Sequence, residues 1–439
     1  MREMKDSGIE WLGNIPELWC IKKLKYACEI YTGDSIKDDE KDLYTETLNA
    51  IPYISTKDID ANTNCIDYKN GLYIPVTNKK FKLAPKYSFL LCVEGGSAGK
   101  KIAYTAQDVN FVNKLCCFKS RKGTNSKFMY FYCQSDAFLT DFYLNMTGLI
   151  GGVSQSMLKN IRIATPHITQ QQKIADYLDG ECARIDGIVT TQRQIIERLK
   201  EYKKSVITEA VTRGLNPDAP MRNSGIDWIG KIPEHWEISK LKYYSKYITD
   251  GTHTTPEYLA DGVPFLSIKD ISAGKLDFSN TKYISQQQHE ELSKHAPIEK
   301  GDILFTRIGT LGVSVIVETD ITFDIFVSVG LLKPKDNINI KHLNYVMNSE
   351  YYYQYIQLVK AGEGTSAAKF NLSDVSNSPI VCPPLSEQQA IADYLDRKCG
   401  KIDNIIEKRE RMIELMTEYK KSLIYECVTG KKEIVDVVE

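Results

Sequence analysis

The chain of 439 residues repeats itself at a separation of 217 positions, and this repeat limits its possible folds more than any other feature. Three pairs of segments keep that separation: 7–26 with 224–243, 171–179 with 388–396, and 201–212 with 418–429. In the first pair, 14 of 20 residues are identical. Similarity at a fixed period indicates a duplicated structural unit. The chain therefore consists of two copies, each opening with "SGIxWxGxIPExW" and closing on "EYKKS".

The interiors of the two copies are only weakly related. "IPYISTKDI" (51–59) resembles "VPFLSIKDI" (263–271), and "LLCVEGGSAG" (90–99) resembles "ILFTRIGTLG" (303–312). Short runs of β-branched and aromatic residues, bounded by Gly, Asp and Asn, predict strands here, with helix at 128–144 and 341–359. We predict an α/β (α+β) fold in which two modules share one scaffold and recognise different things.

The end of each copy predicts a long helix, over 169–214 and 386–430. "TQQQ" and "SEQQ" at the starts fit capping boxes, and Gly214 and Gly430 fit C-terminal stops. Each helix would have about 44 residues, or roughly 65 Å. Because so long a helix is marginal alone, we expect the two to pack as an antiparallel coiled coil with the modules related by a pseudo-two-fold axis.

Apolar residues at helical spacing identify the expected packing positions of this coiled coil. They include Leu178, Ile185, Leu199, Leu395, Ile402 and Met416. Gln192 and Arg409 interrupt the two stripes at equivalent places, and either fix the register or face solvent. The predicted domains are a first module at 1–168, a central helix at 169–215, a second module at 216–385, and a C-terminal helix and tail at 386–439.

Composition and motifs argue against several classes of protein. The eleven cysteines and six histidines show no spacing typical of a disulfide framework or zinc site. No apolar run approaches the roughly 20 residues of a membrane span, and the N-terminus lacks a secretory signal, so we expect a cytoplasmic protein. "EGGSAGKK" (94–101) fails the phosphate-loop pattern and predicts a turn between strands. We therefore expect a non-catalytic chain without a cofactor or metal of its own.

The distribution of charge along the chain does not identify the kind of partner that it binds. The net charge is −1, but 1–168 carries 22 basic and 18 acidic residues, for +4, whereas 216–385 carries 16 and 20, for −4. The basic groups of the first module are Lys79, Lys80, Lys82 and Lys86, and the run 114–127. Such clusters either contact phosphates or form solvated faces.

Polar residues at strand ends and in loops are the candidate DNA-binding residues. Lys and Arg can contact phosphates and guanine, and Asn can pair with adenine. The candidates are Lys57, Ser97, Lys100 and Lys101 in the first module, and Thr252, His253, Lys269, Thr306, Arg307, Thr310, Lys369 and Asn371 in the second. Several of the latter lie in the loops "DGTHTTP" (250–256) and "GTSAAKFN" (364–371). For each residue, the alternative is ordinary loop surface.

On the repeated "SGIxWxGxIPExWxIxKLK" and "EQQxIADYLD…EYKKS" segments, the whole chain resembles the specificity subunit of type I DNA restriction–modification systems. The resemblance implies two target-recognition domains that each read one half of a bipartite, asymmetric site in double-stranded DNA. It also implies helices that set the gap between the halves and dock two methyltransferase (modification) subunits. S-adenosylmethionine would belong to those subunits, and further restriction and translocase subunits would cut the DNA.

Two rival functions stay open at this point. One is a scaffold that binds protein partners through two modules on a coiled coil, which the weak overall charge favours. The other is a fused restriction–methylation enzyme, against which the missing cofactor and metal motifs argue. The tryptophan motif is nearly the same in both copies, so we expect it to seat each module at the helix ends, with its tryptophans as anchors. Contact with the methyltransferase subunits is the alternative.

Overall fold

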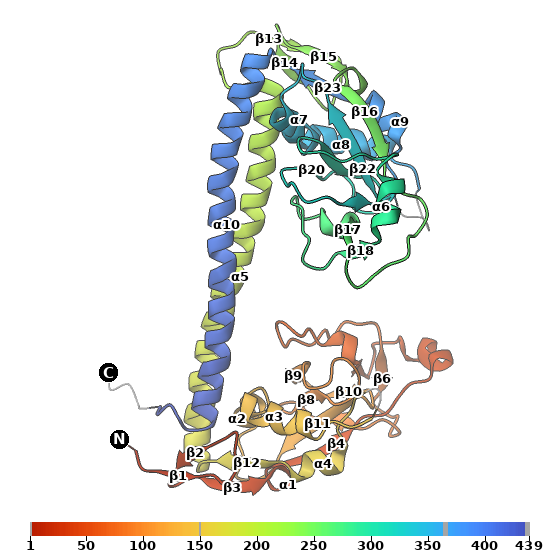
Figure 1. Cartoon of the computed structure of the whole chain (residues 1–439). Helices are drawn as coiled ribbons and strands as arrows, with labels where there is room; N and C mark the ends of the chain where they lie inside the picture. Colours follow the sequence, from red (N-terminus) through yellow and green to blue (C-terminus); the bar gives the residue numbers. More distant parts are fainter. Residues whose placement is uncertain (1, 149–150, 363–367, 435–439) are drawn as a thin grey trace. The chain divides into compact units, whose positions relative to one another are not determined.

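The computed structural model describes residues 2–148, 151–362 and 368–434 (Figure 1). The chain divides into two compact units, Met1–Arg193 with Glu410–Glu439, and Gln194–Arg409. Each unit contains one mixed α/β module and part of each of two long helices. The predicted fold class and internal repeat are confirmed.

Two four-stranded sheets form the first module, in the orders β6-β5-β10-β7 and β4-β11-β8-β9. Their strands are β4 (Cys28–Thr32), β5 (Ala50–Ile54), β6 (Tyr73–Pro75), β7 (Leu83–Ala84), β8 (Phe89–Cys92), β9 (Ile102–Tyr104), β10 (Val109–Phe111) and β11 (Leu115–Ser120). Two ribbons accompany them, β1 (Met4–Asp6) with β2 (Asn14–Pro16), and β3 (Cys20–Lys23) with β12 (Arg162–Thr165). The helices are α1 (Leu24–Ala27), η1 (Asp38–Tyr44), η2 (Thr56–Asp58), α2 (Ser126–Tyr132), α3 (Asp136–Leu144) and α4 (Gln155–Asn160).

The alternating direction of the side chains along β8 explains how the two sheets and the helices pack together. Phe89 and Leu91 join the core formed with the helices, whereas Leu90 and Cys92 join the core between the two sheets. Because successive side chains of a strand point to opposite faces, a strand covered on both faces is apolar throughout. All four residues of β8 are accordingly buried.

The second module has sheets in the orders β16-β22-β19-β20 and β18-β17-β21. Their strands are β16 (Ser245–Asp250), β17 (Val263–Leu266), β18 (Lys282–Ile284), β19 (Ile303–Thr306), β20 (Ser314–Ile316), β21 (Asp324–Ile325) and β22 (Val329–Pro334). The ribbons are β13 (Met221–Asn223) with β14 (Lys231–Pro233), and β15 (Glu237–Lys240) with β23 (Pro379–Cys382). The helices are η3 (Leu241–Tyr243), η4 (Ile268–Asp270), α6 (Gln286–Leu292), α7 (Ile340–Met347), α8 (Glu350–Val359) and α9 (Leu372–Asn377).

The two interiors share one topology although their sequences diverge. The order β4-β11-β8-β9 corresponds to β16-β22-β19-β20, and the parallel pair β5–β10 corresponds to β17–β21. Helices α2 and α3 correspond to α7 and α8 and occupy the two predicted helical stretches. Among the described elements, η1 and β7 are particular to the first module and α6 to the second.

The long helices are α5 (Ile168–Arg213) and α10 (Leu385–Val428), within two residues of the predicted bounds. In the first unit, Leu178 of α5 shares a core with Leu423 of α10, and Lys420 Nζ lies 2.7 Å from Asp186 Oδ2. The start of α5 thus packs against the end of α10.

The second unit shows the converse packing. Val206 near the end of α5 shares a core with Leu395 near the start of α10, and Lys203 Nζ lies 2.7 Å from Asp403 Oδ1. In each unit, an early part of one helix meets a late part of the other. The helices are therefore antiparallel, as predicted.

Most of the predicted packing positions contribute to burial. Leu178, Ile185, Leu395 and Ile402 are buried, and Leu199 and Met416 are partly buried. Gln192 and Arg409 are also partly buried, and their role in register stays a prediction. The apolar stripes extend beyond the buried surface, because Tyr202 and Ile405 are exposed. No helix within residues 2–148, 151–362 and 368–434 combines the length and apolarity that crossing a bilayer requires.

The predicted capping boxes at the starts of the long helices are wrong. Each helix begins one residue before its expected cap, and the glutamines have other partners. Gln172 Oε1 accepts from Asn125 Nδ2 at 2.6 Å, and Gln389 Oε1 accepts from Asn339 Nδ2 at 2.7 Å. Because Asn125 and Asn339 precede α2 and α7, these glutamines attach each module to the helix that follows it.

The tryptophan motif makes a second attachment in each unit. Trp19 and Trp236 are both 1% exposed. Their indole Nε1 atoms donate to Gln170 Oε1 at 3.1 Å and to Glu387 Oε2 at 2.9 Å, in the first turns of α5 and α10. These contacts agree with the predicted anchoring role.

Candidate nucleic-acid interface

Lys57 and Lys101 lie together in the first module. Lys57 is within η2, which is held by a capping box in which the Ser55 backbone N–H donates to Asp58 Oδ2 at 2.7 Å. Lys101 Nζ donates to the Thr56 carbonyl oxygen at 2.7 Å, and both lysines line a cavity of about 470 Å³. The fold thus brings together two of the predicted residues.

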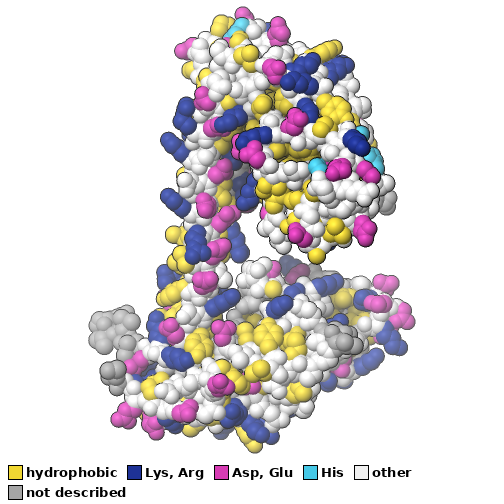
Figure 2. Space-filling view, viewed as in Figure 1, with side chains coloured by type: hydrophobic (Ala, Val, Ile, Leu, Met, Phe, Trp, Pro, Cys, Tyr) yellow, Lys and Arg dark blue, Asp and Glu magenta, His cyan; other side chains and the backbone are white. Residues whose placement is uncertain are grey.

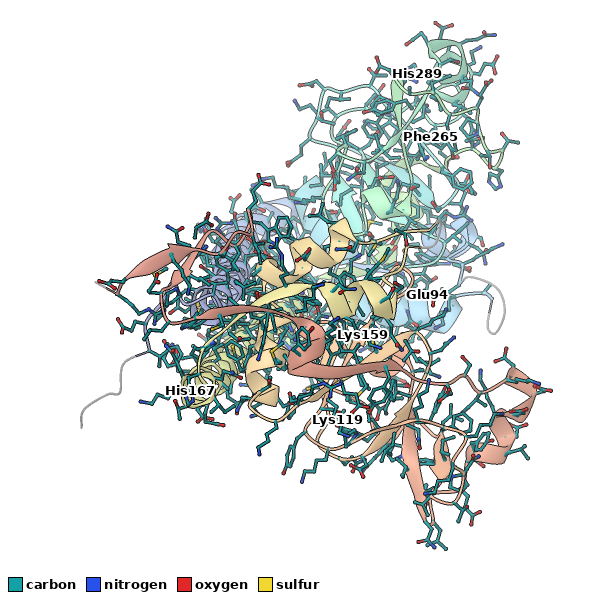
Figure 3. All side chains as sticks on the ribbon, turned by 90° about the horizontal axis from the view of Figure 1, so that it is seen from below. Glu94, Lys119, Lys159, His167, Phe265 and His289 are labelled. Atoms are coloured by element: carbon teal, nitrogen blue, oxygen red, sulfur yellow. The ribbon has the colours of Figure 1, made fainter. Side chains whose placement is uncertain are left out.

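Ser97 and Lys100 lie in the turn between β8 and β9, as the sequence predicted. This turn, which includes Glu94 (labelled in Figure 3), packs against 151–153, since the Gly95 backbone N–H donates to the Gly151 carbonyl oxygen at 2.9 Å. Lys100 is exposed, and its Nζ donates back to the Gly96 carbonyl oxygen at 3.2 Å.

Arg307 is the centre of a buried network in the second module. Its guanidinium pairs with Asp250 at the end of β16, and it also donates to the carbonyl oxygens of Val327 at 3.3 Å and Phe370 at 3.4 Å. Arg307 is 8% exposed and Asp250 is 5% exposed. A buried charge needs such partners, so Arg307 joins three loops and does not project into solvent as a free base reader.

Four predicted residues lie on the loops that Arg307 joins. Thr252 and His253 follow Asp250 after one glycine, Gly251, and His253 Nε2 lies 3.2 Å from Asp250 Oδ2. Lys369 is exposed beside the buried Phe370, and Asn371 Nδ2 donates to Asp374 Oδ2 at 3.2 Å. The start of the predicted loop 364–371, up to residue 367, lies outside the described residues.

The other three predicted residues of the second module differ in accessibility. Thr306 is 1% exposed and its Oγ1 accepts from the Val313 backbone N–H at 3.1 Å, so this hydroxyl stabilises the β19–β20 turn. Thr310, in the same turn, is exposed. Lys269 is exposed and donates to the Asn280 carbonyl oxygen at 3.0 Å.

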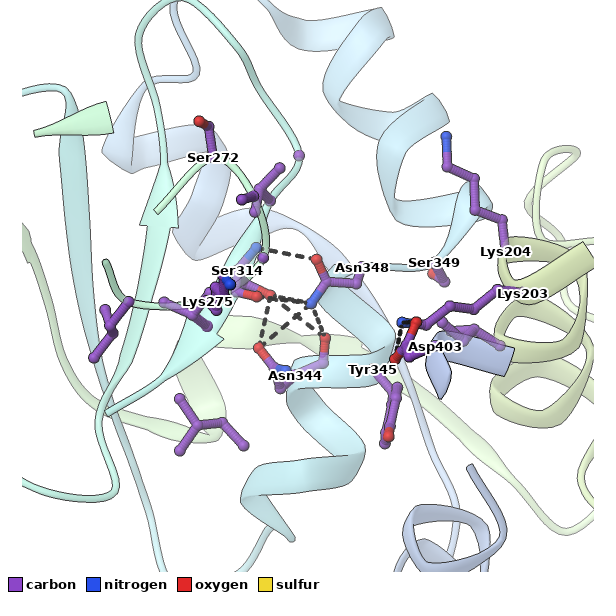
Figure 4. Close-up of a pocket in the computed structure, with 18 of the residues that line it drawn as sticks. Lys203, Lys204, Ser272, Lys275, Ser314, Asn344, Tyr345, Asn348, Ser349 and Asp403 are labelled. Carbon is purple, nitrogen blue, oxygen red and sulfur yellow. Dashed lines mark hydrogen bonds and ion pairs between the residues drawn. The ribbon is translucent and has the colours of Figure 1, made fainter. Parts of the chain in front are cut away.

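A cavity of about 1230 Å³ lies within the second unit, lined by α5, α7, α8, α10 and the β19–β20 turn (Figure 4). Ser314, Asn344 and Asn348 form a hydrogen-bonded group on its wall, with Asn348 Nδ2 2.8 Å from Ser314 Oγ. The lining contains both basic and acidic residues, and two of them, Lys203 and Asp403, pair with each other. Basic and acidic side chains are likewise interspersed over the face of the molecule seen in Figure 2. The cavity therefore has mixed charge.

Burial shifts the pKa values of several cysteine thiols and of one aspartate. It raises the pKa of the Cys28 thiol to about 12 and that of Cys117 to about 11, which keeps both thiols protonated at neutral pH. Burial also raises the pKa of Asp324, although His289 Nδ1 lies 2.7 Å from its carboxylate (Figure 3). Within the described residues, no three His, Cys, Asp or Glu side chains form a metal-binding group.

Strand pairing corrects one alignment between the copies. The sequence comparison placed Glu94 opposite Arg307. In the structure, the Val93 backbone N–H donates to the Lys114 carbonyl oxygen just as that of Arg307 donates to Ser328, so Val93 is the counterpart of Arg307. The alignment was wrong because the β8–β9 turn is longer than the β19–β20 turn. By the same pairing, Thr32 is the counterpart of Asp250.

Two glycines that position the interface escaped the sequence analysis. A Cβ on Gly33 would lie 1.8 Å from the Phe111 carbonyl oxygen, and one on Gly251 would lie 2.0 Å from that of Ile325. Each glycine is the first residue after a strand, at a point where the chain passes directly against a neighbouring backbone. A glycine shortly after a run of β-branched and aromatic residues in both copies, EIYTG and KYITDG, was the available signal.

The fold and the site define a class of protein: two recognition modules of one topology, with different loop side chains, attached to an antiparallel helix pair. Residues 16–201 and 233–415 match the model of the type I restriction modification DNA specificity domain. The chain belongs to this family.

Relatives of this chain extend over nearly its whole length. The type I restriction enzyme MjaVIII specificity subunit of Methanocaldococcus jannaschii is 24% identical over 95% of this chain and 93% of that protein. The EcoBI specificity subunit of Escherichia coli is 21% identical, over 98% and 90%.

Two solved structures share the fold. A chain from a study of complex assembly and conformational transition of the type I R-M system has a TM-score of 0.69 at 17% identity, covering 95% of this chain and 99% of that one. The HsdS subunit from Thermoanaerobacter tengcongensis has a TM-score of 0.50 at 17% identity, covering 97% and 100%.

Proposed function

We propose that each module of this DNA specificity protein reads one half of a bipartite, asymmetric DNA site. The observation that carries the proposal is the contrast between a shared scaffold and unlike loops. Asp250 and Arg307 hold the loops of the second module, where the first has Thr32 and Val93. Because base edges are read by individual side chains, unlike loops on one scaffold recognise unlike sequences.

The candidate residues supply the required chemistry. Lys57 and Lys101 in the first module and Thr252, His253 and Lys369 in the second carry donors that suit phosphate oxygens or base acceptors. They come from connections between strands, which the sheets hold in place. This chain acts in the proposal as a non-catalytic subunit without a cofactor of its own.

The long helices have two proposed tasks. They set the spacing between the half-sites, and they bind two modification subunits, which would hold S-adenosylmethionine; restriction and translocase subunits would complete the assembly. Exposed apolar side chains on the helices support the docking: Tyr202 and Ile405 in the second unit, and Met412, Leu415 and Tyr419 in the first. Where such exposed apolar side chains form a contiguous patch on a helix, they are typical of a protein-binding surface.

Selection from a randomised duplex pool tests the proposal. The full chain, assembled with its modification subunits, should enrich two short fixed sequences separated by a constant gap. Replacing the interior 245–378 with that of a relative should change one fixed sequence only. No enrichment, together with a flat dependence of binding on salt, would contradict DNA recognition and favour a protein scaffold.

A further inference from the structure

The charge difference between the modules is concentrated in one connection of the scaffold. Residues 76–87 lead from β6 to β8 in the first module, and residues 285–301 lead from β18 to β19 in the second. The first connection, here named the basic segment, contains four lysines and no acidic residue; the second contains two lysines and three glutamates. This connection accounts for five of the eight units of charge that separate the modules.

Three of the four lysines of the basic segment have no carboxylate partner. Lys79, Lys80 and Lys86 are exposed, and in the part of the chain that the structure describes no carboxylate oxygen lies within 4.0 Å of their Nζ atoms. Lys82 Nζ, in contrast, lies 3.6 Å from Asp34 Oδ1. The segment therefore presents three ammonium groups to solvent, and one carboxylate lies beside it, since Asp108 Oδ1 accepts the Lys86 backbone N–H at 2.7 Å.

Tyr87 adds an unusual aromatic residue to the segment. Its φ is +68°, in the left-handed region, and the second module has Gly301 at the equivalent position with φ +93°. A bulky residue is strained in this conformation, and packing does not offset the strain, because Tyr87 is 60% exposed. Lys86 Nζ lies over its ring, 4.6 Å from the centroid. A strained, exposed aromatic residue is the kind of outlier that points to binding.

The basic segment borders the loop that follows β4. The Lys82 backbone N–H donates to Asp34 Oδ2 at 2.8 Å, and Lys82 Nζ donates to the Thr32 carbonyl oxygen at 2.9 Å. This loop corresponds to the one that carries Thr252 in the second module. The three exposed lysines are thus on a segment that hydrogen-bonds to a loop of the proposed recognition surface.

We propose that the basic segment binds the phosphate backbone of the target duplex beside the half-site read by the first module. Lys79, Lys80 and Lys86 supply the charges, and the Tyr87 hydroxyl supplies a hydrogen bond to a phosphate oxygen. The equivalent connection of the second module, 285–301, carries three glutamates and two lysines instead. This inference rests on the proposed function and adds an asymmetry to it: the first module contributes most of the salt-dependent affinity.

Measuring affinity against salt tests the basic segment. The assembled full chain is titrated with its selected duplex between about 50 and 200 mM salt, in wild-type form and as K79Q/K80Q/K86Q. Each lost phosphate contact lowers the slope of log affinity against log salt by about 0.9, so the triple variant should lose up to about 2.7 while selecting the same sequences. The matched control K294Q/K300Q, in the equivalent connection of the second module, should keep the wild-type slope.

Tyr87→Gly separates binding from folding. Glycine is the residue that the second module uses here, so this variant should keep or raise the thermal midpoint and weaken duplex binding several-fold. A lower midpoint with unchanged affinity would assign Tyr87 to packing and overturn its binding role.

A wild-type salt slope in K79Q/K80Q/K86Q, with weaker assembly with the modification subunits, would reassign the segment to a protein contact. If the wild-type assembly enriches no sequence, the proposed function itself fails; if it does and the triple variant keeps its slope, this inference alone fails.

Discussion

Equivalent positions with unlike residues show most clearly how one scaffold serves two modules. Asn125 and Asn339 accept from the backbone N–H groups of Phe128 and His342, which makes those two positions equivalent. His342 is 1% exposed, and neither ring nitrogen has a hydrogen-bond partner among the described residues. Burial lowers the pKa of His342 to about 4.

His342→Phe should therefore remove an acid sensitivity of the second unit. Between pH 6.5 and about 4, the unfolded chain binds a proton that the folded His342 does not, so wild-type stability falls as pH falls through this range. The variant should lose that term, worth up to roughly 3 kcal/mol at the acid end. Urea unfolding at pH 5 and pH 8 measures it. The exposed His167→Gln should keep the wild-type pH dependence; an unchanged dependence in His342→Phe would show that His342 titrates normally.

Gly251→Ala should destabilise the second unit because its Cβ would lie 2.0 Å from a backbone oxygen that cannot move alone. Steric overpacking of this kind costs about 1–3 kcal/mol. Gly187→Ala is the matched control, since its added Cβ, within α5, meets nothing within 4 Å and should stabilise by about 0.5–1 kcal/mol. Thermal unfolding of the two variants should shift in opposite directions, and a shift in the same direction would contradict the steric account.

At the level of elements, the repeated motifs supply the contacts that connect the two long helices to each other and to the modules. The first lysine of each "EYKKS" pairs with an aspartate on the other long helix, Lys203 with Asp403 and Lys420 with Asp186. The glutamines of "QQKIADYLD" and "QQAIADYLD" bind the asparagines that open α2 and α7. Both units make the same contacts, and this explains why the motifs are nearly the same in both copies.

A double-mutant cycle on Lys203 and Asp403 should give a coupling of about 0.5–1 kcal/mol, because both side chains are partly exposed to solvent. Asp403→Lys alone should destabilise the second unit, and Lys203→Asp with Asp403→Lys should recover most of the loss. Urea unfolding at low salt measures the terms. The pair Lys200 and Glu197, within one turn of α5, is the control for local helix effects and should couple less.

At the level of the whole molecule, each unit is assembled from distant parts of the chain. Leu423, Ile424 and Val428, near the end of α10, complete the core of the first unit. The first module thus depends on residues that follow the second module in sequence. This arrangement fits a chain whose two recognition modules work as a pair on one helical frame.

Inserting seven residues into both α5 and α10 should lengthen the gap between the selected half-sites and leave both half-sites unchanged. A heptad keeps the apolar stripes in phase and adds about 10 Å of helix, or roughly three base pairs. Duplex selection with the lengthened assembly measures the new gap. Retention of the original gap would contradict the proposal that the helices set the spacing between the half-sites.

Much of the architecture could be predicted because it depends on linear patterns. The repeat, both long helices, their antiparallel packing and the turn at 94–101 all follow from spacing and composition. The capping boxes failed because Asn125 and Asn339, distant in sequence, compete for the glutamines. Candidate site residues were harder to judge, since Lys100 and Thr306 look alike as polar turn residues, yet one is exposed and the other is 1% exposed.

The sequence by itself determined that this protein has two modules of one kind and two long antiparallel helices, because periodicity and duplication are visible along the chain. Only the tertiary structure decided which polar groups are available. The Arg307 guanidinium is paired with the Asp250 carboxylate, whereas the Nζ atoms of Lys79, Lys80 and Lys86 have no carboxylate oxygen within 4.0 Å among the described residues. The physical reason is that a charge is compensated by whatever the fold brings within a few ångströms of it, and those neighbours come from other strands and loops.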